Sequence, residues 1–157
     1  MKKNVAVFIG RFQPFHLGHQ HVVEQALKNY NHVIFLLGSA EQARTPKNPF
    51  TFEERKKMIE NSLSNNDDVK ISILPLHDYI YDNQKWIAEV QNQINSVTEQ
   101  GDFITLIGNI KDKSSEYLKY FPHFNKDFSA GLTKDKLSAT TLRQYLFNLN
   151  EEIDKLK

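Results

Sequence analysis

Two histidines near the start of the chain, His16 and His19, stand three positions apart with Gly18 between them. At the start of a helix, free backbone N–H groups and the positive end of the helix dipole attract anions, and two imidazole N–H groups could point at the same anion. Because Gly18 has no Cβ, we expect a phosphate to approach the backbone there, while the guanidinium of Arg11 suits phosphate oxygens. The spacing therefore predicts a phosphate site; the alternative is that both residues are ordinary, partly buried histidines near a turn.

A second phosphate-binding candidate is the late segment Ser138–Arg143, read SATTLR. The hydroxyls of Ser138 and Thr140 stand at the start of a segment of helical spacing, so they and the backbone N–H groups can point at one anion. Arg143 lies about one turn further along and could add a bidentate contact. The alternative is a simple helix N-cap followed by a solvated arginine.

A third charged segment is the polar loop 39–49, which carries Arg44 and Lys47. Its two prolines restrict its conformation, and a capping box of Thr51 and Glu54 follows it. The loop could project its cations toward a ligand, or it could be a solvated basic loop before a capped helix.

The elements that position these residues follow from hydrophobic spacing. Four segments have the pattern of strands: 5–10, 32–37, 69–76 and 103–107. Helical spacing predicts helices at about 19–30, 51–63, 86–101 and 138–149, with a helix possible in 114–120 and a short last strand within 125–137. Alternating strands and helices imply a parallel sheet with right-handed crossovers. Ligands then bind beyond the carboxyl ends of the strands, where the strand order reverses, and each charged loop between these elements follows a strand.

Composition sets further bounds. The 157 residues suffice for one domain, 1–157. A net charge of +1 provides no global field for nucleic acid or an anionic membrane. The absence of cysteine excludes disulfides and thiolate metal sites, and it fits a reducing cytoplasm. Because no signal peptide or apolar run of membrane-spanning length is apparent, we expect a soluble cytoplasmic protein without membrane or nucleic-acid partners.

The string GRFQPFHLGH, from Gly10 to His19, resembles the H-x-G-H motif of the nucleotidyltransferase superfamily, and SATTLR resembles its S-x-T-x-x-R signature. The longer form GRFQPFH, together with SAEQARTPKNPFTFEER, is similar to nicotinamide mononucleotide adenylyltransferases of the archaeal type, which also occur fused to Nudix domains. The sequence contains no Nudix signature. The resemblance implies the nucleotidyltransferase fold, a Rossmann-like doubly wound parallel sheet in three α/β/α layers. It also implies adenylyl transfer from ATP to nicotinamide mononucleotide, giving NAD and pyrophosphate, with Mg²⁺ bound mainly through ATP and with a homo-oligomeric enzyme.

The resemblance also assigns roles to residues. As catalytic residues it implies His16, His19 and Arg143. As ATP and phosphate contacts it implies Gly10, Arg11, Phe12, Gly18, Arg44, Lys47, Gly108, Ser138 and Thr140. As contacts of the nicotinamide nucleotide it implies Ser39, Phe50, Asp78, Asn83 and Trp86. It implies no metal-ligating residue.

The nicotinamide contacts have chemistry that suits the ring. A positively charged pyridinium stacks well on an indole face such as that of Trp86, and its carboxamide needs a donor and an acceptor nearby. Trp86 on the apolar side of its helix could equally be a core residue. The segment GNIKDKSS after the fourth strand resembles the family near the adenosine, but the roles of Asn109, Lys111 and Asp112 stay open.

Two other functions fit the same phosphate motifs. One is adenylyl or cytidylyl transfer to another phosphorylated acceptor, such as phosphopantetheine or glycerol phosphate. The other is a non-catalytic sensor that binds ATP or NAD. The preference between the amide and the acid mononucleotide is also left open by the sequence.

Overall fold

The computed structural model describes residues 2–42, 44–63, 67–108, 116–129 and 142–148 of the chain. Its centre is a five-stranded sheet in the order β3-β2-β1-β4-β5, with every neighbouring pair parallel. The strands are β1 (Asn4–Gly10), β2 (His32–Leu37), β3 (Lys70–Pro75), β4 (Phe103–Ile107) and β5 (Asn125–Asp127). Because β1 pairs with both β2 and β4, the strand order reverses between β1 and β4. Because all the strands are parallel, their carboxyl ends lie together along one side of the sheet, which we call the carboxyl edge.

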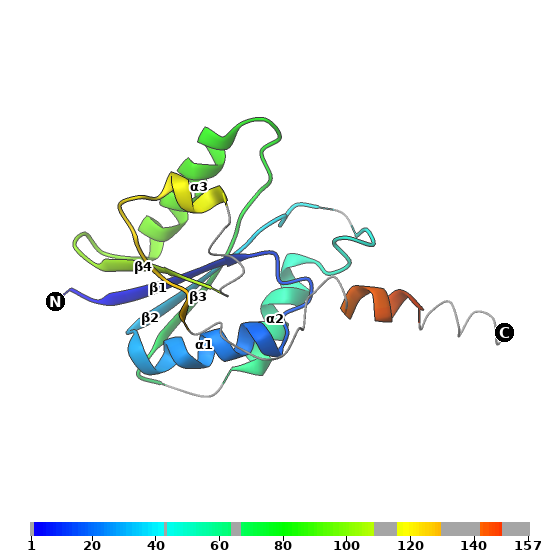
Figure 1. The fold of residues 1–157 in the computed structure, drawn as a ribbon, viewed down its shortest axis with the longest axis horizontal. Coiled ribbons are helices and arrows are strands. Elements are labelled where there is room, and N and C mark those ends of the chain that lie inside the picture. The colour runs from blue at the N-terminus through cyan, green and yellow to red at the C-terminus, as the bar shows by residue number, and fades with distance from the viewer. Residues whose placement is uncertain (1, 43, 64–66, 109–115, 130–141, 149–157) are drawn as a thin grey trace.

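Helices cover both faces of the sheet (Figure 1). Helices α1 (Leu17–Asn29) and α2 (Phe52–Ser62) pack on one face against alternate residues of β1, such as Ala6 and Phe8. Helix α3 (Asn83–Val97) and the 3₁₀-helix η2 (Glu116–Tyr120) pack on the other face, against Val5 and Val7. Successive side chains of β1 therefore point to opposite faces of the sheet and belong to two separate hydrophobic cores. The predicted doubly wound, three-layer α/β/α architecture is confirmed.

The element boundaries differ from the predicted ones where caps decide them. Helix α1 begins at Leu17 rather than near His19, because His16 is its N-cap. Helix α3 begins at Asn83, where Asp82 caps it by accepting the Lys85 N–H, and it ends at Val97 rather than near residue 101. The possible helix in 114–120 is a 3₁₀-helix, the predicted last strand is β5, and residues 142–148 are helical as predicted.

Three loops at the carboxyl edge contain strained backbone. Phe12 after β1, Ser39 after β2 and Tyr81 after β3 have positive φ angles of 51°, 53° and 61°. Such angles are unfavourable for residues with a Cβ, and they concentrate at functional sites. The strain marks the same edge at which a doubly wound sheet binds ligands. In the described part of the chain, no helix has both the length and the apolar character needed to cross a membrane.

Candidate active site

His16 and His19 form a reciprocal capping box at the start of α1. The Nδ1 atom of His16 accepts the backbone N–H groups of Gly18 (3.1 Å) and His19 (3.4 Å), and the Nδ1 atom of His19 accepts the backbone N–H of His16 (3.2 Å). The two rings stack with their centroids 3.7 Å apart. The H-x-x-H spacing thus acts as S-x-x-E does in an ordinary capping box.

This geometry corrects two expectations. The backbone N–H groups of Gly18 and His19 are not free for an anion, because the His16 ring already accepts both. A Cβ on Gly18 would lie 2.9 Å from Cε1 of His16, so the missing side chain makes room for that ring rather than for a phosphate. Gly18 is needed at this position for a packing reason that the sequence did not indicate.

The capping box also fixes the tautomer of both rings. Since each Nδ1 accepts an N–H, we infer that each neutral imidazole carries its hydrogen on Nε2. Burial, and then the neighbouring His16, lower the pKa of His19 to about 3. His19 is therefore neutral near pH 7, and it presents Nε2–H as an uncharged donor.

Three phenylalanines explain why His19 is so strongly desolvated. Phe15 stacks on the His19 ring at 5.5 Å, while Phe12 and Phe8 meet it edge-on at 4.8 and 5.8 Å. The Phe12 ring folds back over Gly10, where a Cβ would come within 3.1 Å of it. The structure therefore places Phe12 in the core behind His19, with its side chain away from solvent.

Arg143 reaches the loop that carries the two histidines. Its Nη1 donates to the backbone oxygen of Gln13 at 2.7 Å, across 130 positions of sequence, and its side chain is buried. Burial, and then the charge of Arg11, lower the pKa of Arg143. Arg143 thus brings a second guanidinium, beside that of Arg11, to the loop that carries the two histidines, and two neighbouring cations favour an anion.

Arg55 is a buried cation that sequence reasoning did not single out. Its guanidinium donates to the backbone oxygens of Arg11 and Gly38 at 2.7 Å each, of Thr51 at 3.2 Å and of Ser39 at 3.5 Å. Burial, and then the charge of Arg11, lower its pKa. It ties the carboxyl ends of β1 and β2 to α2. The sequence did contain one signal for its burial: Arg55 lies four residues before the inward-facing Ile59, and residues four apart share one face of a helix.

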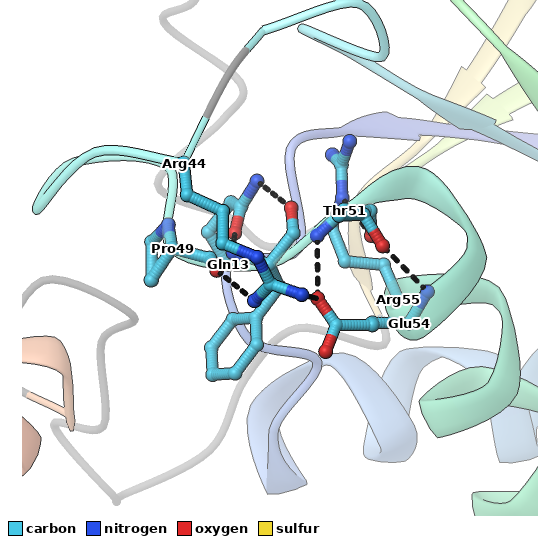
Figure 2. A network of polar contacts seen from close by, with 7 residues as sticks. Gln13, Arg44, Pro49, Thr51, Glu54 and Arg55 are labelled. Atoms are coloured by element: carbon cyan, nitrogen blue, oxygen red, sulfur yellow. Dashed lines mark hydrogen bonds and ion pairs between the residues drawn. The ribbon is translucent and has the colours of Figure 1, made fainter.

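Figure 2 shows how the loop 39–51 is fastened. The side-chain amide of Gln13 binds the backbone of Phe50 twice, with Nε2 donating to its oxygen and Oε1 accepting its N–H, both at 3.0 Å. Arg44 binds Glu54 at 2.8 Å and the backbone oxygen of Pro49 at 3.0 Å. In this structure Arg44 thus faces the start of α2 rather than the histidine pair.

The predicted nicotinamide contacts divide into two groups. Asp78, Asn83 and Trp86 come together in one open cavity of about 420 Å³, whose lining is completed by Tyr79, Ile80, Tyr117 and Tyr120. The Asn83 amide donates to the hydroxyl of Tyr120 at 3.0 Å. Trp86 lies edge-on to Tyr117 at 6.2 Å and also packs against the second core, so it is both a wall of the cavity and a core residue. The predicted contacts of the loop 39–51, Ser39 and Phe50, are not part of this lining.

The remaining predicted residues are placed as follows. Gly108 is buried directly after β4, and Lys47 is exposed. Ser138, Thr140, Asn109, Lys111 and Asp112 lie outside the described residues. A second cavity, of about 290 Å³ between α1 and β5, is lined by none of the predicted site residues. Within the described ranges, no three His, Asp or Glu side chains are grouped so that they could hold a metal ion.

The chain is similar in sequence and in fold to known proteins. Residues 7–145 match the family described as cytidylyltransferase-like. The chain is 42% identical over 143 residues to a nicotinamide/nicotinic acid mononucleotide adenylyltransferase of Acinetobacter baylyi, covering 91% of this chain and 75% of the relative. It is 40% identical over 94 residues to a nicotinamide-nucleotide adenylyltransferase of Archaeoglobus fulgidus, covering 57% of this chain and 53% of that one.

Solved structures give the same grouping. A bifunctional NMN adenylyltransferase/ADP ribose pyrophosphatase from Francisella tularensis superposes with a TM-score of 0.83 at 38% identity over 93% of this chain. A second structure of such a bifunctional protein from Francisella tularensis, complexed with AMP and a manganese ion, has a TM-score of 0.79. In each case the chain spans 42% of the bifunctional chain.

Proposed function

The chain belongs to the cytidylyltransferase-like family, and from this premise we propose that it transfers the adenylyl group of ATP to nicotinamide mononucleotide, giving NAD and pyrophosphate. One observation carries the proposal: Arg143, the cation of the late phosphate motif, donates to the backbone of Gln13 in the loop that carries the early motif. The names of the Acinetobacter and Archaeoglobus relatives support nicotinamide mononucleotide as the acceptor. The aromatic cavity around Trp86 supplies a place for its ring.

The reaction needs positioning and charge neutralisation rather than a covalent enzyme intermediate. A phosphate oxygen of the mononucleotide attacks the α-phosphorus of ATP, and the bond from that phosphorus to the pyrophosphate oxygen breaks. We assign to His16 and His19 the donation of Nε2–H to phosphate oxygens. We assign to Arg11 and Arg143 the compensation of negative charge as pyrophosphate leaves. Ser138 and Thr140, outside the described residues, stay proposed contacts of the same phosphates.

A divalent ion, which we propose to be Mg²⁺, would arrive bound to the triphosphate. The described side chains at the histidine pair are imidazoles and guanidiniums, which suit phosphate oxygens rather than a bare cation. The Francisella structure that holds AMP and a manganese ion is consistent with a divalent ion beside the nucleotide. When bound, such an ion offsets charge on the phosphates.

The cavity around Asn83 and Trp86 fits the acceptor ring. The indole of Trp86 and the rings of Tyr117 and Tyr120 offer π-faces to a pyridinium cation. Asp78 adds a carboxylate of opposite charge in the same lining. We propose that this cavity holds the nicotinamide part of the mononucleotide.

Three further expectations stay proposals: that residues 1–157 act as one domain, that the chain forms homo-oligomers, and that it works in the cytoplasm. Self-association follows from the family resemblance. The side chain of Tyr81, which is fully exposed in the single chain, is one apolar surface that a second copy could cover. Light scattering at several protein concentrations tests it: a mass of one chain at every concentration would reject it.

Turnover tests the proposed reaction directly. The protein is incubated with ATP, Mg²⁺ and, separately, nicotinamide mononucleotide, the acid mononucleotide, phosphopantetheine and glycerol phosphate. We expect pyrophosphate release and NAD with the nicotinamide mononucleotide. Release only with phosphopantetheine or glycerol phosphate would reassign the acceptor, and ATP binding without any release would identify a sensor.

A further inference from the structure

Gln13 lies where three segments of the chain meet. Its side-chain amide binds the backbone of Phe50 in the loop 39–51, with two hydrogen bonds of 3.0 Å. Its own backbone oxygen accepts the guanidinium of Arg143 at 2.7 Å. It also lies three positions before His16, in the loop that leads to the capping box.

The side chain of Gln13 is buried, and its amide is bound through both its nitrogen and its oxygen. It is 1% exposed, and both ends of its amide are bound to Phe50. A buried amide that pairs with a backbone donor and a backbone acceptor resembles one rung of a strand ladder, and water cannot compete for it. The amide keeps a second Nε2 hydrogen and a second Oε1 lone pair, but the side chain is buried, so we expect it to make no contact with a nucleotide. Any effect on the reaction must then pass through the neighbours of Gln13.

One of those neighbours is Arg143, which is assigned to phosphate, and another is the end of the loop 39–51. Phe50 follows Pro49, whose oxygen holds Arg44, and it precedes Thr51, the N-cap of α2. A shift of Gln13 would therefore move the end of the loop 39–51 and the acceptor of Arg143 together. We propose that Gln13 is a positioning residue that fixes the loop 39–51, the loop before His16 and Arg143 relative to one another; the inference rests on the proposed adenylyl transfer.

The first test compares Gln13→Met with a matched control. Methionine has similar length and cannot form the two hydrogen bonds, so it leaves the Phe50 groups unpaired. Gln20→Met also removes a long-range bond from a glutamine amide to a backbone oxygen, that of Ser62 at 2.7 Å, but between α1 and the end of α2. We expect the kcat of Gln13→Met to fall about 10²-fold, as small misplacements of catalytic groups do, and Gln20→Met to keep wild-type kcat. An unchanged kcat in Gln13→Met overturns the inference.

A double-mutant cycle separates positioning from general destabilisation. If Gln13 acts through Arg143, Gln13→Met should cost much less in an Arg143→Lys background than in the wild type, because groups that act as a unit are non-additive. Additive losses of kcat/KM in the two single variants and the double variant would mean that the two residues do not act together. That result would overturn the proposed coupling.

Amide hydrogen exchange tests the contact without any turnover. In the wild type, the Phe50 N–H should exchange about as slowly as the Gly38 N–H, which donates to the backbone oxygen of Gly10 at 2.8 Å. In Gln13→Met the Phe50 N–H should exchange faster than in the wild type, while the exchange rate of the Gly38 N–H should stay the same. Fast Phe50 exchange in the wild type overturns the inference even if the variant does not fold. If the wild-type protein makes no NAD, the proposed function fails independently of this inference. The exchange result then still decides whether Gln13 holds the backbone of Phe50.

Discussion

We expect Gly18→Ala to lower kcat strongly while it changes the free energy of unfolding only a little. The added Cβ would stand 2.9 Å from Cε1 and 3.1 Å from Nδ1 of the His16 ring; the first distance is shorter than real Cβ contacts, and the second is tighter than most of them. The ring cannot simply retreat, because the His19 ring is stacked on it at 3.7 Å. We therefore expect His16 to rotate out of the capping box.

Two opposing effects determine how much Gly18→Ala changes the free energy of unfolding. Losing a cap costs roughly 1 kcal/mol, while replacing glycine by alanine within a helix gains roughly 0.5–1 kcal/mol. The free energy of unfolding should thus change by less than about 1 kcal/mol. In contrast, a displaced donor should lower kcat by about 10²-fold.

The assay is pyrophosphate release at saturating ATP and mononucleotide, together with urea unfolding of the same preparations. Leu17→Ala is the matched control, because Leu17 lies in the same helical turn with its side chain 67% exposed. It should leave both quantities nearly unchanged. Wild-type kcat in Gly18→Ala would refute the assignment of the capping box to catalysis, and so would a loss of kcat no larger than that caused by Leu17→Ala.

Four further results are expected. Replacing Arg143 or His19 by Ala should lower kcat at saturating ATP by about 10²–10³-fold with the far-UV circular dichroism retained. The pKa values of His19 and His32 are lowered from 6.5 to about 3 and about 4, so below pH 6.5 the unfolded chain binds more protons than the folded chain. The free energy of unfolding should therefore fall as the pH drops from 6.5 toward 4, by up to about 1.4 kcal/mol per pH unit for each group. A flat profile of urea unfolding from pH 7 to 5 contradicts this. Arg55→Met should cost about 3 kcal/mol or more in urea unfolding because it leaves buried carbonyl oxygens without donors, and Arg55→Lys should recover only part of the loss. Trp86→Ala should raise KM for the mononucleotide more than KM for ATP, and an equal rise in both would remove the cavity from acceptor binding.

Hydrophobic spacing was enough to predict most of the fold. Apolar runs such as VAVFIG and HVIFLL marked β1 and β2, and the alternation of strands with helices implied the parallel sheet. The charged loops were correctly placed after strands, which is why the predicted residues Asp78, Asn83 and Trp86 share a cavity.

The contacts that hold the site could not be read from the sequence because backbone groups form half of each. Arg55 binds four backbone oxygens, and Gln13 binds the backbone of Phe50, so no partner side chain signals either contact. The capping box of His16 and His19 was missed for a related reason. Histidine is an unusual N-cap, and chemistry offered a competing explanation for the same spacing.

The attachment of Arg143 to Gln13 also has a consequence for biosynthesis. On the ribosome the strands and their crossover helices emerge before residue 143, so the sheet can form while translation continues, as domains generally fold from the N-terminus onward. The last cation reaches the histidine loop only after the sheet is built. A nascent chain would therefore have its sheet before its complete phosphate site, because the site lacks one of its cations until Arg143 has emerged.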